Sequence, residues 1–360
     1  MKIHTKSSII RHVPIIHGGL KSRKHRDRHI VDFSSNIAPN GMPSSIKTAL
    51  KKNLVEIEQY PDSHSRKLHS SLQKYLRVPK HNIIVGNGAI EIIYNFCYAF
   101  LSKNTKVLIP IPTFQEYENA SRLNDSKISY FKTMNLSNDV DSFLSSIPKN
   151  GCIFICNPNN PTGKLLSKTQ LLTIVESAKK LSSIVFVDEC FIELVPDVNE
   201  SIVSYVKKYD NLFVLRSLTK SYGLPGLRVG YGVGSKKIIT ILEKIKIPWS
   251  VNSLAEIAGV IAIDDKSHLK NSKLLIKKEL SYLKKNISKI NGFDCIDSST
   301  NFILIKTKID STEIQKKLLK KHILIRDCKN FRNLDNHFIR IAVKSHKENM
   351  LLVKALEAIK

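Results

Sequence analysis

The sequence lacks the features of a membrane-spanning, secreted or disulfide-stabilised protein. No stretch approaches the roughly 20 consecutive apolar residues that a bilayer-spanning helix needs. The N-terminal segment carries Lys2, Lys6 and Arg11 between short apolar runs and does not resemble a secretory signal. The six cysteines form no C-x-x-C pair, which argues against a metal site or a disulfide framework. We therefore expect a cytoplasmic protein with no membrane partner and no metal.

Acidic residues are also scarce. The chain has 31 Asp and Glu and 57 Lys and Arg, which gives a formal net charge of +26. Such an excess can indicate a nucleic-acid partner, since basic patches bind phosphate backbones. The basic residues are spread along the chain, however, and the one dense cluster, at 21–29, has no interleaved aromatic side chains. We expect a Lys-rich surface that attracts small phosphorylated anions, and no nucleic acid.

From about residue 82 the chain alternates short β-branched runs with segments of helical period. The runs NIIVGNG (82–88), GCIFICN (151–157) and SIVFVDE (183–189) are typical of buried strands, and residues 167–181 have the spacing of an amphipathic helix. Apolar strands that alternate with helices predict an α/β fold with a mostly parallel sheet covered on both faces.

The pattern changes after Pro248. One long basic helical stretch is expected over roughly 252–290, followed by shorter strands and helices, as in a smaller α+β domain. The first 45 residues contain turn-forming Gly, Pro and Asn and show little periodicity. We predict an N-terminal arm at 1–45 associated with the small domain, a large domain at 46–247, and a small C-terminal domain at 248–360.

Lys220 lies just beyond the strand-like run LFVLRS. A lone lysine is usually a solvated surface charge, but hydroxyls flank this one at Ser217 and Thr219, and Arg228 follows. Sites in open α/β sheets form at the carboxyl ends of strands, and hydroxyls together with an arginine can bind phosphate. A desolvated lysine near cationic groups has a lowered pKa and can form a Schiff base. We predict a Schiff-base lysine beside a phosphate site.

Three further segments each allow both a structural and a cofactor-binding interpretation. Asp188 ends the run VFVD and could cap a helix, or it could pair with the protonated nitrogen of a pyridine cofactor. NPNNPTG (157–163) has turn composition, but the Asn160 amide could bond a ring hydroxyl. In GNGAIE, Gly88 and Ala89 open a helix whose N-terminus favours an anion.

In the order glycine turn, NPNNPTG, Asp188, S-x-x-K and Arg228, these segments resemble the class I/II aminotransferase family, fold type I of the pyridoxal 5'-phosphate (PLP) enzymes. The resemblance runs over nearly the whole chain. It implies that Lys220 forms the Schiff base, that Asp188 pairs with the ring nitrogen and that Asn160 bonds the ring hydroxyl. It assigns the cofactor phosphate to Ser217, Arg228, Gly88 and Ala89, ring stacking to Phe114, and a phosphate contact to Tyr60 of a second subunit, so that a homodimer is expected.

Two activities within the family compete, and both act on phosphorylated amino compounds. The segment IIHGG (15–19), and Phe191 in DECF where the aminotransferases usually have a tyrosine, are similar to the threonine-phosphate decarboxylases. These make 1-amino-2-propanol phosphate for the cobalamin nucleotide loop. Histidinol-phosphate aminotransferase is the alternative, and a nucleic-acid-binding protein on an inactive PLP fold is a third possibility. We hypothesise that the anions of threonine phosphate are held by His17, Gly18, Asn36, Asn160, Arg326 and Arg340.

Overall fold

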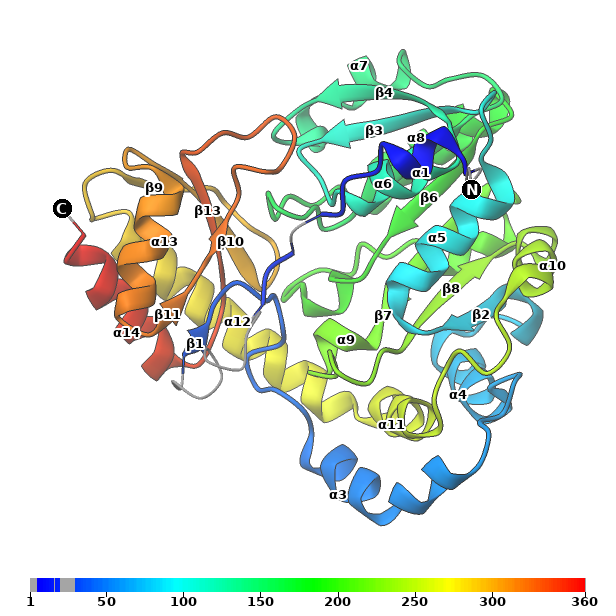
Figure 1. Cartoon of the computed structure of the whole chain (residues 1–360), viewed down its shortest axis with the longest axis horizontal. Helices are drawn as coiled ribbons and strands as arrows, with labels where there is room; N and C mark the ends of the chain where they lie inside the picture. The colour runs from blue at the N-terminus through cyan, green and yellow to red at the C-terminus, as the bar shows by residue number, and fades with distance from the viewer. Residues whose placement is uncertain (1–4, 16, 20–29, 360) are drawn as a thin grey trace, which may run out of the picture.

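The structure is a computed structural model that describes residues 5–15, 17–19 and 30–359 (Figure 1). The basic cluster at 21–29 lies outside these residues. Within the described part of the chain, no helix combines the length and the apolar character that crossing a membrane requires. The same residues contain no group of three or more His, Cys, Asp or Glu side chains that could hold a metal ion.

A seven-stranded sheet forms the centre of the larger part of the molecule. Its strands, in spatial order, are β2 (Ile83–Gly86), β8 (Gly230–Gly234), β7 (Leu212–Ser217), β6 (Ile184–Asp188), β5 (Cys152–Cys156), β3 (Lys106–Ile111) and β4 (Lys127–Lys132). β8 runs antiparallel to both of its neighbours, and the other pairs are parallel. The mostly parallel sheet predicted from the sequence is therefore confirmed.

Side chains of these strands alternate between two apolar cores, because successive residues of a strand point to opposite faces. Val185 and Val187 of β6 lie in one core, and Phe186 lies in the other. The first core is covered by α3 (Ser44–Lys52), α4 (Arg66–Leu76), α7 (Val140–Leu144), α8 (Lys168–Lys180) and α11 (Ser253–Asp264). The second is covered by α5 (Gly88–Phe100), α6 (Glu116–Leu123) and α10 (Lys236–Ile245).

The C-terminal part has a smaller sheet and a core of its own. Four antiparallel strands lie in the order β12 (Arg326–Asp327), β13 (Phe338–Ala342), β10 (Phe302–Thr307) and β9 (Phe293–Cys295). They pack with α12 (Lys266–Ile287), α13 (Ser311–Lys320) and α14 (His346–Glu357). The arm joins this core, since β1 (Val31–Asp32) pairs in parallel with β11 (Ile323–Leu324) and Phe33 is fully buried there (Figure 1). The domain boundaries at 45 and 247 stay predictions.

The basic stretch over 252–290 forms two helices, where the sequence suggested one. The break lies at Asp265, whose carboxylate accepts a hydrogen bond from the backbone N–H of His268 (3.0 Å) and caps α12. Ala255 and Ala258 of α11 lie in the first core of the large sheet, against α3 and α4. The basic helix is therefore α12 alone.

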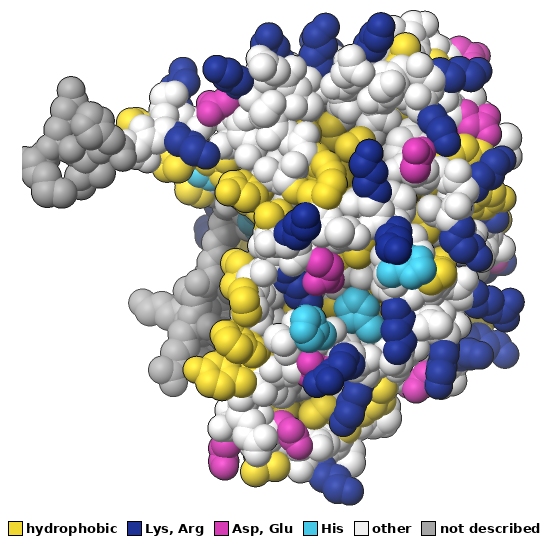
Figure 2. Space-filling model, turned by 90° about the vertical axis from the view of Figure 1, so that its right-hand side faces the viewer, with side chains coloured by type: hydrophobic (Ala, Val, Ile, Leu, Met, Phe, Trp, Pro, Cys, Tyr) yellow, Lys and Arg dark blue, Asp and Glu magenta, His cyan; other side chains and the backbone are white. Residues whose placement is uncertain are grey.

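Short helical turns connect the remaining elements. They are α1 (Ser7–Ile10), α9 (Leu218–Ser221), and the 3-10 turns η1 (Leu54–Glu58), η2 (Lys80–Asn82), η3 (Leu136–Asn138), η4 (Ile192–Leu194) and η5 (Val203–Lys207). Figure 2 shows that the Lys and Arg side chains on one face are scattered among other side chains and form no continuous stripe. This distribution differs from the basic stripe typical of nucleic-acid-binding surfaces.

Candidate active site

Three strand ends meet at one edge of the large sheet. β5, β6 and β7 are parallel neighbours and end at Cys156, Asp188 and Ser217. A cavity of about 350 Å³ opens at this edge, as expected at the carboxyl ends of parallel strands. Most of the predicted residues line it: His17, Gly18, Asn36, Ala89, Phe114, Asn160, Asp188, Ser217, Lys220, Arg228, Arg326 and Arg340. The fold thus brings together the arm, the large sheet and the C-terminal strands.

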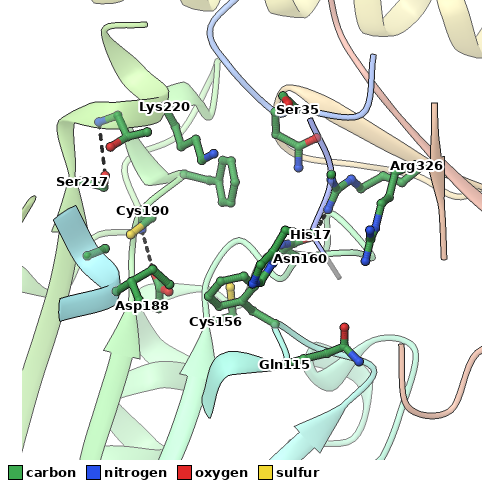
Figure 3. A pocket seen from close by; sticks show the side chains of 18 of the residues that line it. His17, Ser35, Gln115, Cys156, Asn160, Asp188, Cys190, Ser217, Lys220 and Arg326 are labelled. Carbon is green, nitrogen blue, oxygen red and sulfur yellow. Dashed lines mark hydrogen bonds between the residues drawn. The ribbon is translucent and has the colours of Figure 1, made fainter. Parts of the chain in front are cut away.

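Lys220 lies in α9, the single helical turn that directly follows β7. Its carbonyl accepts a hydrogen bond from the backbone N–H of Ala38 (2.9 Å), which ties this turn to the arm. In Figure 3 the Lys220 side chain reaches into the cavity, with Arg326 on the opposite side and His17 and Asn160 between them. Burial, and then the charge of Arg340, lower the pKa of Lys220 to about 8. A larger share of the amine is then neutral, which is the form that attacks a carbonyl carbon.

Asp188 is a buried acid at the floor of the cavity. One carboxylate oxygen accepts a hydrogen bond from the backbone N–H of Cys190 (2.8 Å), and the other accepts one from the hydroxyl of Tyr117 (2.6 Å). Tyr117 is itself fixed by stacking on Phe154, with ring centroids 5.2 Å apart. Burial raises the pKa of Asp188. A cation placed in the cavity would favour its ionised form, and the protonated nitrogen of a pyridine ring is such a cation.

An anion cradle lies at the start of α5. Gly88 has a φ of +78°, and a Cβ built there would come 2.5 Å from a guanidinium nitrogen of Arg228. Glycine is therefore needed both for the backbone conformation and for the close approach of the arginine. The Ser217 hydroxyl accepts a hydrogen bond from the N–H of Thr219 (3.2 Å), whose own Oγ1 is buried without a partner. Helix N-terminus, guanidinium and hydroxyls together fit a phosphate.

Two arginines face each other on the small sheet. Arg326 of β12 and Arg340 of β13 are paired across the antiparallel strands, and each is 6% exposed. Arg340 donates hydrogen bonds to Oδ1 of Asn160 and to the carbonyl of Ser34 (2.9 Å), and Arg326 donates to Oδ1 of Asn330 (2.9 Å). Burial lowers the pKa of both, that of Arg340 to about 10. Among the described residues neither guanidinium pairs with a carboxylate, so the pair favours a ligand with two anionic groups.

Three residues of the N-terminal arm line the cavity: His17, Gly18 and Asn36. A Cβ on Gly18 would come 2.7 Å from the carbonyl oxygen of Ser34, so the arm can lie this close only with glycine there. Ser34 is held by Asp32, whose Oδ1 accepts hydrogen bonds from its N–H (2.8 Å) and its hydroxyl (2.6 Å). Oδ1 of Asn36 is buried without a partner and can accept a hydrogen bond from a ligand.

The aromatic residues divide into two groups. Phe114 and Phe191 line the cavity, and Phe191 packs edge-to-face on Phe302 with ring centroids 5.2 Å apart. Tyr60 lies outside the cavity of its own chain, is 83% exposed, and packs against Trp249 at 5.1 Å between centroids. Its predicted contact with the cofactor phosphate of a second subunit stays a prediction.

The sequence did not reveal several residues at the cavity rim. Glu116 binds His17 through a 2.6 Å contact between Oε1 and Nε2, although the two residues are far apart in the chain. Gln115 donates to the carbonyl of Asn330, and Phe331 lines the cavity. Glu116 and Gln115 follow Phe114 in PTFQEY, and that nearness was the one available signal; no local pattern links them to the arm or to the loop before β13.

The residues present fit PLP on three independent observations. Lys220 supplies an amine of lowered pKa, and Asp188 supplies a buried acid. The cradle at Gly88 offers a place for phosphate, and Oγ1 of Thr219 is buried there without a partner. When bound, PLP supplies an electron sink for bonds broken at the carbon that carries the substrate amine. The fold and the cavity therefore define a PLP-dependent enzyme.

Comparisons with known proteins give the family. The family model "Aminotransferase class I and II" matches residues 28–359. A Caldanaerobacter subterraneus subsp. tengcongensis protein, provisionally named a threonine-phosphate decarboxylase, is 39% identical over 90% of this chain and 89% of its own. A histidinol-phosphate aminotransferase of Methanococcus aeolicus is 34% identical over 92% and 90%. The crystal structure of L-threonine-O-3-phosphate decarboxylase from Porphyromonas gingivalis is 28% identical, with a TM-score of 0.83 over 91% and 98%.

The chain belongs to the class I and II aminotransferase family and uses PLP. The α/β fold predicted from the sequence, that of fold type I PLP enzymes, is confirmed. Proteins named as decarboxylases and as aminotransferases are both similar in sequence to this chain, so family membership does not determine which reaction it catalyses.

Proposed function

We propose that this enzyme decarboxylates L-threonine O-3-phosphate to (R)-1-amino-2-propanol phosphate, a building block of the cobalamin nucleotide loop. The observation that carries the proposal is the facing pair Arg326 and Arg340, buried at one cavity without a carboxylate partner among the described residues. Threonine phosphate presents a phosphate and a carboxylate within one small molecule, which matches two adjacent cations. The 39% identity to the Caldanaerobacter protein supports the same activity.

The chain decides which bond to Cα breaks by how it holds the two anions. Arg326, Arg340, His17 and Asn36 share the carboxylate and the phosphate, and Arg340 is anchored to Asn160 at the large sheet. In decarboxylation the Cα–carboxylate bond breaks, carbon dioxide leaves, and a proton takes its place on Cα. Lys220, with a pKa of about 8, can hold and deliver that proton near neutral pH.

Phe191 also favours decarboxylation. Its ring lies at the cavity wall on Phe302, where the aminotransferases usually have a tyrosine. Phenylalanine offers no hydroxyl to a ring oxygen, so the hydrogen bond that tyrosine would make is missing from this wall.

We propose a homodimer as the functional unit. Exposed apolar side chains gather around the turn η1 and Trp249, on the same surface as Tyr60. They are Leu54, Val55, Ile57, Tyr60, Ile247 and Trp249, each more than half exposed. A group of exposed apolar side chains of this kind can mark an interaction surface, and a second copy would bring Tyr60 to the neighbouring cavity. Light scattering on the purified protein should give twice the 40.8 kDa chain mass.

A carbon dioxide assay tests the proposed reaction. Holoenzyme given L-threonine phosphate labelled in the carboxylate should release labelled carbon dioxide with no keto acid present, and Lys220→Ala should release none. Amino transfer from histidinol phosphate to 2-oxoglutarate, without carbon dioxide, would reject the proposal in favour of the aminotransferase. Inactivity with both substrates, together with salt-sensitive retention on DNA, would favour a nucleic-acid-binding protein.

A further inference from the structure

The contact between His17 of the arm and Glu116 of α6 has a defined hydrogen-bond donor and acceptor. Glu116 is the first residue of α6 and is 6% exposed, and its Oε1 lies 2.6 Å from Nε2 of His17. Its other oxygen accepts a hydrogen bond from the hydroxyl of Tyr94 on α5 (2.7 Å). Burial raises the pKa of Glu116, but the hydrogen bonds from His17 and Tyr94 outweigh it and lower that pKa. The N-terminus of α6 also favours an ionised carboxylate.

An ionised Glu116 determines which nitrogen of His17 carries hydrogen. A carboxylate accepts and cannot donate, so Nε2 of His17 must be the protonated nitrogen. The contact with Glu116 occupies Nε2, so Nδ1 is the ring nitrogen that remains for a ligand, and His17 lines the cavity. The imidazole lies beside the ring of Phe114, with ring centroids 6.0 Å apart.

We propose that Glu116 is a positioning residue that makes His17 a cationic ligand for the substrate phosphate, donating from Nδ1 while Nε2 stays bound to Glu116. This inference rests on the proposed function for its phosphorylated substrate. With phosphate bound, charges alternate along the row from Glu116 through the imidazolium to the phosphate, and each contact is a charge-assisted hydrogen bond. Among the described residues, Glu116 contacts His17, and Tyr94 and His12 act on Glu116. The ionisable groups that line the same cavity as His17 include Asp188, Lys220, Arg228, Arg326 and Arg340.

The arm segment that carries His17 is also connected to Arg340. Gly18, next to His17, lies against Ser34, and the carbonyl of Ser34 accepts a hydrogen bond from Arg340. His17 and Arg340 are therefore held by one local framework, and a phosphate bound by both would join the arm to the C-terminal sheet.

Inorganic phosphate titrated into the holoenzyme tests the inference by calorimetry. Glu116→Gln keeps the side-chain size, removes the charge, and should weaken phosphate binding at least about 10-fold at pH near 7.5. His17→Gln should cause a similar loss, and the double variant no further loss, because the two residues act as one unit. Asp125→Asn is the matched control: it disturbs another arm contact, from the Ser8 hydroxyl (3.3 Å), and should bind phosphate like the parent protein.

A spectroscopic measurement separates positioning from a general loss of arm structure. In holoenzyme with ¹⁵N-labelled histidine, the His17 signals, assigned by their loss in His17→Gln, should show hydrogen on Nε2, and on both nitrogens when phosphate saturates the site. Normal phosphate binding by Glu116→Gln, or additive losses in the double variant, would overturn the inference. Because phosphate alone is the probe, failure of the carbon dioxide assay leaves this test intact.

Discussion

The buried amine of Lys220 should capture PLP at neutral pH far faster than an ordinary lysine. A Schiff base forms from the neutral amine, and the pKa of Lys220 is lowered to about 8, first by burial and then by Arg340. At pH 7.4 about one fifth of such an amine is neutral, against about one in a thousand for a lysine with the usual pKa near 10.4. The expected advantage in the fraction of reactive amine is therefore about 200-fold.

Stopped-flow mixing of cofactor-free protein with PLP follows the fraction of neutral Lys220 amine, because the rate of Schiff-base formation is proportional to it. The rate at which the visible absorbance of lysine-bound cofactor appears should rise with pH and level off above about 8, because a lowered pKa means the proton is lost earlier. Arg340→Gln removes a charge that lowers the pKa, so the midpoint should move to higher pH. Arg326→Gln, on the facing strand, serves as the control and should leave the midpoint nearly in place.

Two results would refute this reasoning. A midpoint near that of free lysine would show that the amine is solvated and that the burial argument is wrong. An unchanged midpoint in Arg340→Gln would show that the arginine does not act on the amine. Lys220→Ala must give no lysine-bound absorbance after dialysis, since a persisting band would place the Schiff base on another residue.

Three further substitutions probe the site and its support. Asp188→Asn should keep bound PLP while lowering kcat at least about 100-fold, measured by the carbon dioxide assay, because an amide cannot stabilise a protonated ring nitrogen. Gly88→Ala should weaken PLP binding about 10-fold or more in equilibrium dialysis, since its Cβ would meet Arg228 at 2.5 Å and its φ is +78°; unchanged affinity would contradict the cradle. Arg216→Met breaks a buried ion pair with Glu189 (2.9 Å) and should lower the free energy of unfolding by about 3–5 kcal/mol in urea titrations.

The elements that follow a regular period were predictable from sequence. Apolar runs such as GCIFICN and SIVFVDE became β5 and β6, and the residues at their ends, Asp188 among them, met at one edge because parallel strands share a direction. The cofactor residues are local in this sense. Asn160, Asp188 and Lys220 stand at or just after the end of a recognisable strand, and strand order brings them together.

Long-range contacts could not be predicted in the same way. Nothing near His17 shows that the arm would lie against Glu116, because the pairing depends on how the whole arm packs. The break at Asp265 was missed because helical period continues on both sides of it, and only the cap by the Asp265 side chain marks the start of α12. Arg326 and Arg340 were predictable as residue types in apolar strands, but their direct pairing required the strand register.

The facing guanidinium groups of Arg326 and Arg340 also have a thermodynamic consequence for the empty enzyme. Two like charges in a weakly hydrated site repel each other, so the ligand-free fold carries an unfavourable electrostatic energy that a bound anion removes. Any phosphate or sulfate that binds the native chain and not the unfolded one raises its melting temperature as its concentration rises. If the proposed substrate binds here, it stabilises the fold as well as entering the reaction, and phosphate buffers should stabilise the protein while they compete with that substrate.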